Sequence, residues 1–324
     1  MKKSLLALLI IIMGASISKA QQDPQFTHNM FDKLSVNPGY AGMDDMLNVT
    51  GIYRTQWTGF SGVNTPETIL LNAHLPVLKE TSFHGGAGIT VYNDELGAEK
   101  NNLIRLSYSY HMTLGSGKLG GGINIGYFNK ELSQDWKAND PHTQDIAIPN
   151  SGITSSVFDV SLGLYYKTNK LHMGISSTHL AESDFEFSGG SGAQQFDLGL
   201  KKQRHYYVMA GYKYFIGGDR KYQLHPFIFA KSDAASTQID LNANFLYDEK
   251  AWIGFSYRPD DAISPMIGYQ YEKGNYKLKA GYSYDLTTSE LNTYSNGSHE
   301  VMLQVLYNIV KPPPDREYHN VRFL

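Results

Sequence analysis

The sequence has 324 residues, contains no cysteine and carries a formal net charge of −3 at pH 7. The lack of cysteine excludes a disulfide framework and a thiolate metal site, and the mildly acidic balance gives no indication of nucleic-acid binding. Residues 1–20 begin with a basic stretch, continue with an apolar run over 5–13 and end with Ser18-Lys19-Ala20. This pattern predicts a secretory signal peptide that is cleaved after Ala20. The apolar run is about half of the roughly 20 residues that a spanning helix needs, so we expect an exported protein without a helical anchor.

Residues 21–45 form a lead-in segment that we predict to be neither helix nor regular strand. Pro24 and the Asn37-Pro38-Gly39 triplet interrupt regular structure, because proline fixes φ and lacks an amide donor. Proline followed by glycine suits the two central positions of a type II turn, so the triplet predicts such a turn. The segment is too apolar for a free tail, and we expect these side chains to be buried: Phe26, Met30, Phe31, Leu34 and Tyr40.

The first strand-like run, Tyr53-Arg54-Thr55-Gln56-Trp57, alternates between a polar face and a mostly apolar face. Arg54 and Gln56 lie on the polar face. The planar guanidinium of Arg54 offers five hydrogen-bond donors. We therefore expect Arg54 and Gln56 to point inward and to hold the lead-in segment by hydrogen bonds.

Residues 46–310 continue as a series of alternating segments of about ten residues. In residues 239–247, apolar side chains face one way, whereas Asp240, Asn242 and Asn244 face the other. On this basis we predict about fourteen strands, near residues 46–57, 66–76, 83–93, 101–114, 117–128, 156–167, 170–178, 204–216, 221–231, 237–247, 250–258, 263–272, 275–286 and 298–310.

The lengths of the connections separate a membrane barrel from a soluble sandwich, because both classes show the same alternation. Connections after even-numbered strands are turn-like, for example Gly115-Ser116-Gly117, whereas the others are mostly longer, including 129–155, 179–203 and 287–297. Short turns at one rim and long loops at the other are typical of outer-membrane barrels. The sequence therefore predicts an all-β fold, a transmembrane antiparallel up-and-down β-barrel of about 14 strands over residues 46–310, with both termini in the periplasm.

The last predicted strand ends at three prolines after Lys311, because proline cannot donate to a ladder, and residues 311–324 are expected to form a periplasmic tail. Eight strands are filled by their own side chains and sixteen to eighteen leave an aqueous channel, so about fourteen leave space in the lumen. We expect the lead-in segment, or one of the loops 129–155 and 179–203, to fold inward and occlude the lumen.

Tyrosine is abundant, with 23 residues. Outer-membrane barrels carry girdles of aromatic side chains where the strands meet the two membrane interfaces. We assign to such girdles the tyrosines near predicted strand ends: Tyr53, Tyr92, Tyr127, Tyr166, Tyr214, Tyr247, Tyr271 and Tyr284.

The sequence carries no enzyme signature. No pair of histidines has a metal-ligand spacing, and His74, His111 and His172 fall on the polar face of predicted strands, where we expect them in a lumenal polar network. The glycine runs 85–88 and 120–122 are not followed by a helix with a Lys-Ser pair, so they predict small lumenal or bend positions rather than phosphate loops. We predict no enzyme activity, no cofactor and no catalytic or metal-binding residue.

The lead-in segment and first strand resemble the PorP/SprF family of type IX secretion system proteins. That family has a DPQ-aromatic segment that leads to an Asn-Pro-x-Tyr-Ala-Gly turn, and then an Arg-x-Gln-Trp-x-Gly strand. The family commonly has alanine where this chain has Gly39. The matching residues here are Asp23-Pro24-Gln25-Phe26, then Asn37-Pro38-Gly39-Tyr40-Ala41-Gly42, and then Arg54, Gln56, Trp57 and Gly59.

The resemblance implies a non-enzymatic component of type IX protein secretion in the outer membrane of a Gram-negative bacterium. It implies a docking scaffold for the export or surface attachment of secreted adhesins, including those of gliding motility. Its expected partners are outer-membrane lipid, other type IX components on the periplasmic side and, for some paralogues, an adhesin. The residues expected to dock partners or shape the lead-in segment are Pro24, Gln25, Phe26, Asn37, Pro38, Tyr40, Gly42, Arg54, Gln56, Trp57 and Gly59.

A FadL-like transporter or pore for small hydrophobic molecules is the alternative. Those proteins also have about fourteen strands and an Asn-Pro-Ala segment near the N-terminus, so the pair Asn37-Pro38 alone does not separate the two classes. The strand Arg54-Thr55-Gln56-Trp57 favours the PorP/SprF family.

Overall fold

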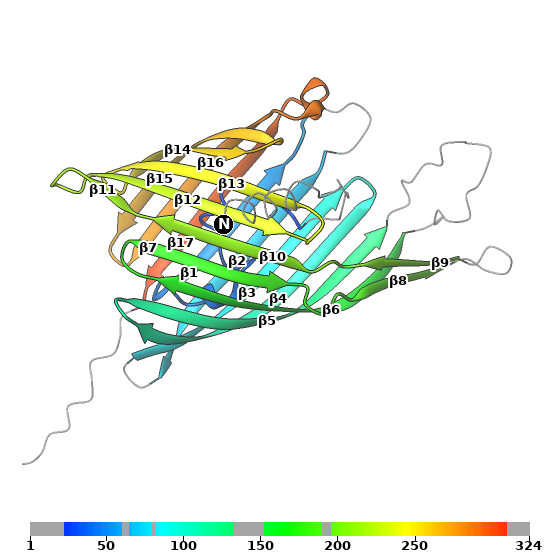
Figure 1. Ribbon diagram of the computed structural model, residues 1–324, viewed down its shortest axis with the longest axis horizontal. Coiled ribbons are helices and arrows are strands. Elements are labelled where there is room, and N and C mark those ends of the chain that lie inside the picture. Colours follow the sequence, from blue (N-terminus) through cyan, green and yellow to red (C-terminus); the bar gives the residue numbers. More distant parts are fainter. Residues whose placement is uncertain (1–22, 60–64, 80–81, 133–151, 190–195, 310–324) are drawn as a thin grey trace, which may run out of the picture.

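The computed structural model describes residues 23–59, 65–79, 82–132, 152–189 and 196–309. The predicted signal peptide and C-terminal tail lie outside the described residues. Within these ranges the chain forms antiparallel strands (Figure 1). Their bounds are β1 Met46–Thr55, β2 Glu67–Lys79, β3 Ser82–Leu96, β4 Glu99–Leu114, β5 Gly117–Leu132, β6 Ile153–Lys167, β7 Leu171–Thr178, β8 Asp184–Gly189, β9 Phe196–Lys201, β10 His205–Tyr212, β11 Tyr214–Ile216, β12 Tyr222–Ser232, β13 Thr237–Tyr247, β14 Ala251–Arg258, β15 Ala262–Lys273, β16 Tyr276–Thr287 and β17 Ser298–Asn308.

The strands follow one another around a closed barrel. Consecutive strands pair from β1 to β7 and from β12 to β17, β17 pairs with β1, and β10 pairs with both β7 and β12. β10 and β11 are two parts of one strand interrupted at Lys213, so the described residues contain fourteen barrel strands. The predicted up-and-down barrel of about 14 strands is confirmed, and each predicted segment overlaps one of these strands.

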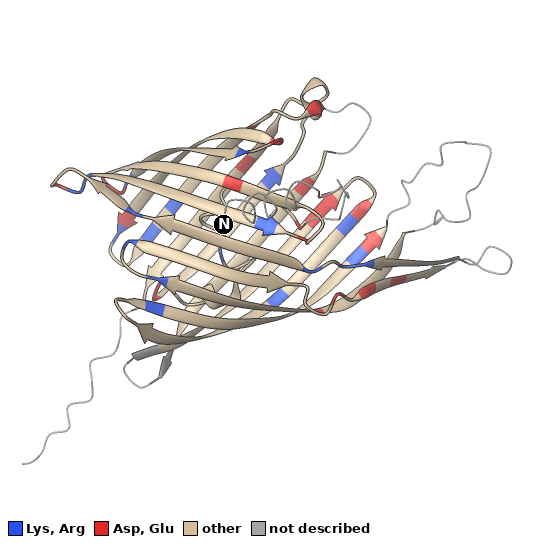
Figure 2. Cartoon of the chain, in the orientation of Figure 1, with Lys and Arg blue, Asp and Glu red and all other residues tan. Residues whose placement is uncertain are grey.

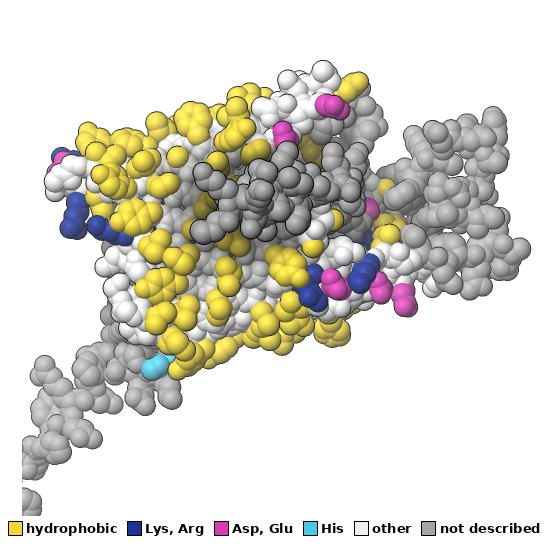
Figure 3. All heavy atoms as spheres, in the orientation of Figure 1, with side chains coloured by type: hydrophobic (Ala, Val, Ile, Leu, Met, Phe, Trp, Pro, Cys, Tyr) yellow, Lys and Arg dark blue, Asp and Glu magenta, His cyan; other side chains and the backbone are white. Residues whose placement is uncertain are grey.

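Side chains alternate between the lumen and the outer surface along each strand. In β4, Leu106 is 63% exposed, whereas the neighbouring Arg105 is 2% exposed. In β13, Asp240 and Asn242 are buried and Leu241 is exposed. Figure 3 shows hydrophobic side chains spread over the outer face of the barrel. The outer face is therefore suited to lipid, and polar side chains line the interior.

Most of the tyrosines assigned to aromatic girdles do face outward. Tyr53, Tyr127, Tyr214 and Tyr247 are exposed at strand positions on the outer surface. Tyr92 is the exception, because it is buried and its ring packs against other lumenal aromatic side chains. The assignment of Tyr92 was therefore wrong, since its position in β3 has the inward parity.

The connections define two rims. The short-turn rim carries turns such as 115–116, 168–170 and 248–250, and β1 begins and β17 ends there. The long-connection rim carries the other connections, of which 97–98 is short and the β7–β10 connection is long. We had predicted a plain loop over 179–203, but this connection contains the hairpin β8–β9, which projects beyond the barrel in Figure 1.

Two short 3-10 helices occur among the described residues, η1 Pro38–Tyr40 and η3 Glu290–Thr293. In the described part of the chain, no helix has the length and apolar character needed to cross a membrane. η3 lies in the connection between β16 and β17, and η1 lies in the lead-in segment. η1 lies inside the barrel, because the lead-in segment occupies the lumen.

Candidate functional site

Residues 23–45, which we call the plug, lie inside the barrel (Figure 1). The amide of His28 donates to Glu300 Oε1 in β17 at 2.7 Å, whereas the side chain of Asn37 donates to Leu164 O in β6 at 3.0 Å. Five strands separate β6 from β17 in one direction and seven in the other. The plug therefore crosses the lumen and contacts nearly opposite walls.

The plug also runs along the length of the barrel. Tyr207 near the start of β10 donates its hydroxyl to Asp23 Oδ2 at 2.9 Å, which places Asp23 toward the long-connection rim. At the short-turn rim, Lys118 near the start of β5 donates to Asp45 Oδ1 at 2.7 Å. The lead-in segment is one of the candidates that the sequence offers for folding inward, and the structure places it in the lumen, with its first described residue toward the rim opposite to the start of β1.

Arg54 joins the plug to the wall near the long-connection rim. Its guanidinium lies 2.7 Å from Asp285 Oδ2 and 3.1 Å from Glu300 Oε2, and Nη1 donates to Thr27 Oγ1 of the plug at 3.2 Å. These three charged side chains are at most 3% exposed. The expected hydrogen bond from Arg54 to the lead-in segment is therefore present, and the same cation neutralises two buried wall carboxylates.

A second buried arginine supports the plug from β14. Arg258 Nε donates to Asp240 Oδ1 at 3.2 Å, and its Nη1 donates to Asp261 Oδ2 at 2.8 Å. Asp240 also accepts a hydrogen bond from the plug, since Asn29 Nδ2 lies 2.9 Å from its Oδ2. The plug thus donates hydrogen bonds to wall carboxylates. Arginines of the wall already balance the negative charge of these carboxylates.

A third charged group surrounds Asp23. His179 Nε2 lies 2.9 Å from both carboxylate oxygens of Asp23, and Lys202 Nζ lies 2.7 Å from Oδ1. Asp23, His179 and His205 bring potential metal ligands within 4.8 Å of one another, and such a set can hold a divalent metal. Lys202 already supplies the cation that Asp23 needs, so we interpret this group as an ion-pair network that holds the start of the plug.

The three residues of the plug that follow Asp23 also lie in the lumen. Phe26 is buried in a hydrophobic cluster with Ile52 and Leu70 of the wall. Lys231 Nζ donates to Asp23 O at 3.3 Å, and Pro24 and Gln25 are half-buried. The DPQ-aromatic motif therefore packs against the barrel interior.

The Asn37-Pro38-Gly39 triplet does not form the predicted type II turn. η1 begins at Pro38, and Gly39 lacks the positive φ that the second central position of a type II turn requires. The side chain of Asn37 accepts a hydrogen bond from Gly39 N at 2.9 Å and donates to Leu164 O and Ile175 O of the wall. Asn37 thus caps η1 and anchors it, and these tertiary contacts select the 3-10 turn.

Gly39 is needed for space rather than for φ. A Cβ on Gly39 would lie 2.8 Å from Gly120 O and 2.9 Å from Gly163 O. A Cβ on Gly120 would overlap Gly39 O, and a Cβ on Gly122 would overlap the backbone of Pro38. The wall glycines therefore form a recess that receives η1, which confirms small lumenal positions in this glycine run.

Replacing Gly122 by leucine should push the plug out of this recess, since overpacking typically costs about 1–3 kcal/mol. Gly121→Leu is the matched control, because a Cβ there meets only a side-chain atom of Leu164, at an ordinary 3.5 Å. Limited proteolysis of the purified barrels measures plug release. We expect faster cleavage within the plug for Gly122→Leu alone, and equal cleavage of both variants would show that the recess does not hold the plug.

Tyr40 packs inside the lumen and does not reach a free surface. It is 4% exposed, and its ring centroid lies 4.9 Å from that of Tyr165 and 5.1 Å from that of His74. Its hydroxyl donates to Asp44 Oδ2 at 2.6 Å. Gly42, at φ 73°, donates its amide to His74 Nδ1 at 3.0 Å. Tyr40 therefore presents no exposed surface for docking at the rim, and its ring forms part of the interior packing.

The end of the first-strand motif lies at the long-connection rim. β1 ends at Thr55, earlier than predicted, and Trp57 has φ 52°, which a strand does not accommodate. Gly59 has φ 96°. The backbone amide of Gln56 donates to Pro66 O at 2.9 Å. The expected hydrogen bond from Gln56 to the lead-in segment does not occur among the described residues, because Gln56 follows the end of the strand.

Burial and neighbouring charges shift the pKa values of ionisable groups in the plug. Burial raises the pKa of Asp32 to about 6. Burial also lowers the pKa of Lys33 to about 7, although the nearby Asp44 opposes this shift. Burial alone would raise the pKa of Asp44, but Lys167 and His74 hold it well below its usual range. Lys33 is therefore only partly charged at neutral pH, whereas Asp44 is ionised.

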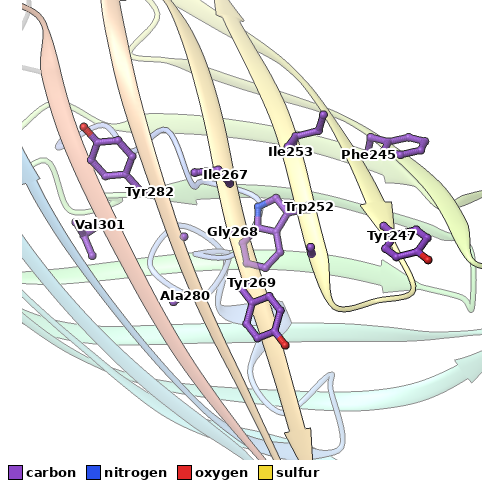
Figure 4. A pocket seen from close by; sticks show the side chains of 12 residues that line it. Phe245, Tyr247, Trp252, Ile253, Ile267, Gly268, Tyr269, Ala280, Tyr282 and Val301 are labelled. Atoms are coloured by element: carbon purple, nitrogen blue, oxygen red, sulfur yellow. The ribbon is translucent and has the colours of Figure 1, made fainter.

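An apolar groove of about 670 Å³ lies on the outer face of β13 to β17 (Figure 4). Gly268 and Ala280 leave room there between the larger side chains of Ile253, Tyr269 and Tyr282. Because these larger side chains face outward, an apolar molecule in the groove would stay in the lipid.

The sequence did not single out the wall residues that hold the plug. Figure 2 shows basic and acidic residues on neighbouring strands, and Arg105, Asp240 and Glu300 are buried at strand positions that face the lumen. A charged residue at an inward strand position was therefore the available signal. The residues that sequence reasoning missed are Arg105, Asp159, His179, Lys202, Asp240, Arg258, Asp285 and Glu300.

Comparisons with known proteins bear on both the family and the fold. The family model described as "Type IX secretion system membrane protein PorP/SprF" matches residues 18–305. Among solved structures, the chain is similar to the toluene transporter TbuX of Ralstonia pickettii, with TM-score 0.50, 12% identity, and coverage of 85% of this chain and 92% of that chain. It is also similar to the toluene transporter TodX of Pseudomonas putida, with TM-score 0.48, 11% identity and coverage of 89% and 95%. At this identity the likeness to TbuX shows the fold alone. The comparison with curated proteins found no match.

Proposed function

Because the chain belongs to the PorP/SprF family of type IX secretion system membrane proteins, we propose that it serves that system as a docking scaffold for the export or surface attachment of secreted adhesins. The observation that carries the proposal is the plug, which charged and hydrogen-bonded contacts tie to the wall along the whole lumen. A barrel filled in this way offers partners its rims and connections. It does not offer them an open channel.

The proposal includes an orientation in the outer membrane. Short turns of such barrels face the periplasm and long connections face outward. In this orientation β1 begins and β17 ends at the periplasmic rim, whereas Asp23 lies toward the outer rim. The expected periplasmic position of the C-terminus is thus retained, and the plug begins near the outer rim and ends near the periplasmic rim.

Single cysteines test this orientation, since the chain has none of its own. Thr293 lies at the long-connection rim and Asn275 at the short-turn rim, and both are exposed. A membrane-impermeant maleimide should label Thr293→Cys on intact cells, but Asn275→Cys only after the outer membrane is permeabilised. The reverse pattern of labelling would contradict the orientation.

A static scaffold supports export with the plug in place, whereas an export path through the lumen requires the plug to move. Asn72 Nδ2 in β2 donates to Asp32 Oδ1 of the plug at 2.6 Å, so cysteines at these two positions can be joined by a short, reducible bis-methanethiosulfonate. We expect cargo export to continue when the plug is locked, with each single-cysteine variant as control. Export that stops on locking and returns on reduction would contradict a static scaffold and favour a lumenal path.

Co-purification tests the docking role directly. We expect the barrel, extracted in mild detergent, to retain other type IX components and a secreted adhesin. A barrel that purifies alone from cells that are actively secreting would contradict the proposed function.

A further inference from the structure

A basic cavity of about 200 Å³ opens between the plug and the wall near the short-turn rim. Lysines from four separate parts of the chain line it. With histidines neutral, these four lysines and two carboxylates leave a formal excess of two positive charges. The charged lining residues are Lys33 of the plug, Lys167 at the end of β6, Lys213 between β10 and β11, Lys279 in β16, Asp44 and Glu249.

The two carboxylates of the cavity already have other partners. Asp44 accepts from Lys167 Nζ at 2.6 Å and from the hydroxyl of Tyr40 at 2.6 Å. Glu249 Oε1 accepts from Gln223 Nε2 at 2.9 Å. Neither carboxylate is therefore free to balance the charge of the remaining three lysines.

The ammonium groups of Lys33, Lys213 and Lys279 have no hydrogen-bond or ion-pair partner among the residues that the structure describes. Lys33 Nζ lies over the ring of Tyr40, 5.0 Å from its centroid, and Lys279 Nζ lies over the ring of Phe31 at 5.5 Å. A cation that is partly removed from water without a counter-charge is costly. Three such lysines, of which Lys33 is only partly charged at neutral pH, converge on one cavity and therefore favour the entry of an anion.

We propose that this cavity binds carboxylate side chains from an acidic segment of a protein partner. The cavity lies inside the wall, so an occupant reaches it from the aqueous phase at the rim and not from the bilayer. Its volume corresponds to roughly six or seven water molecules, which suits one or two carboxylate side chains. The proposal rests on the proposed docking function and names the chemistry by which a partner is recognised at this rim.

Binding should depend on pH through Lys33, whose pKa is lowered to about 7. Above that pH, the anion must draw a proton onto Lys33, so we expect about tenfold weaker binding at pH 8 than at pH 6. The other ionisable groups around the cavity also act on the charge of Lys33. The acidic groups among them oppose the lowering of its pKa. They are Asp44, Tyr40, Tyr165, Lys167, His172, Lys213, His225, Glu249 and Lys279.

The test measures binding of fluorescein-labelled hexaglutamate to the purified full-length protein by fluorescence anisotropy, with hexaglutamine as the neutral probe. We expect hexaglutamate alone to bind. Each of the variants Lys33→Gln, Lys213→Gln and Lys279→Gln should weaken binding about tenfold, since each removes a charged hydrogen-bond donor that meets the anion. Lys170→Gln and Lys221→Gln, which change exposed lysines in turns of the same rim, should leave binding unchanged.

Equal effects in the cavity and turn variants, or no binding of hexaglutamate, would overturn the proposal. Binding of inorganic phosphate or of monomeric short-chain phosphatidylglycerol without binding of hexaglutamate would also overturn it, and would assign the cavity to a free anion or a lipid headgroup. Lys213 and Lys279 belong to the wall, so their variants remain informative if Lys33→Gln disturbs the plug. A barrel that binds no hexaglutamate but still co-purifies with type IX components would refute this site and leave the proposed function standing.

Discussion

Replacing Arg54 by methionine should lower the free energy of unfolding by about 3–5 kcal/mol, because removing one partner of a buried ion pair leaves the other charges uncompensated. Glu300 would stay buried in the wall without its arginine partner, and Asp285 would keep only the more distant Arg258, whose Nη1 lies 3.6 Å from Oδ2. The plug would also lose the donor that reaches Thr27 Oγ1. Urea titration of the purified barrel, followed by its heat-modifiable migration, measures the effect.

An exposed ion pair provides the matched control for Arg54→Met. Lys100 Nζ lies 3.4 Å from Glu95 Oε1, and the two side chains are 43% and 47% exposed. Lys100→Met should therefore cost no more than about 1 kcal/mol. An equal loss of stability in the two variants would show that the buried ion pairs of Arg54 stabilise the protein no more than an exposed ion pair does.

Replacing Tyr40 by alanine should lower the free energy of unfolding by about 3–5 kcal/mol, because it removes a large buried ring and leaves a cavity. Tyr40→Phe keeps the packing against Tyr165 and His74 and removes only the hydrogen bond to the ionised Asp44, so we expect a smaller loss of about 1.5–3 kcal/mol. Urea titration and the amount of folded barrel in the outer membrane measure both effects.

The same variants decide between a structural and a docking role for Tyr40. Its burial predicts that Tyr40→Ala reduces the amount of folded barrel. A variant that accumulates at the normal level with normal stability, but no longer supports cargo export, would contradict the structural role and indicate contact with a partner.

The strands could be predicted from the sequence because their signal is local. β13 was predicted with both ends correct, since its apolar and polar residues alternate with Leu246 as the single exception on the polar face. The interruption at Lys213 and the hairpin β8–β9 were missed. Each part of that hairpin is a six-residue strand, too short for the alternation to separate it from a loop.

The path of the plug could be predicted only in part, because it depends on residues far away in the chain. The donors of Arg54 indicated a holding role, but its acceptors Asp285 and Glu300 lie more than two hundred residues later. The type II turn at Pro38-Gly39 followed from local preference alone. The close approach of Gly39 to Gly163 and the cap from Asn37 overrode that preference, and neither contact has a signal in the lead-in segment itself.

Planar-bilayer recording tests the central claim, that residues 23–45 occlude the lumen, most directly. We expect the purified intact protein to insert without a large steady conductance, because the plug contacts the wall from one rim to the other. A variant that lacks residues 23–45 should conduct, since about fourteen strands leave an open lumen when nothing fills it. A large steady conductance of the intact protein, equal to that of the deletion variant, would contradict the occluded scaffold.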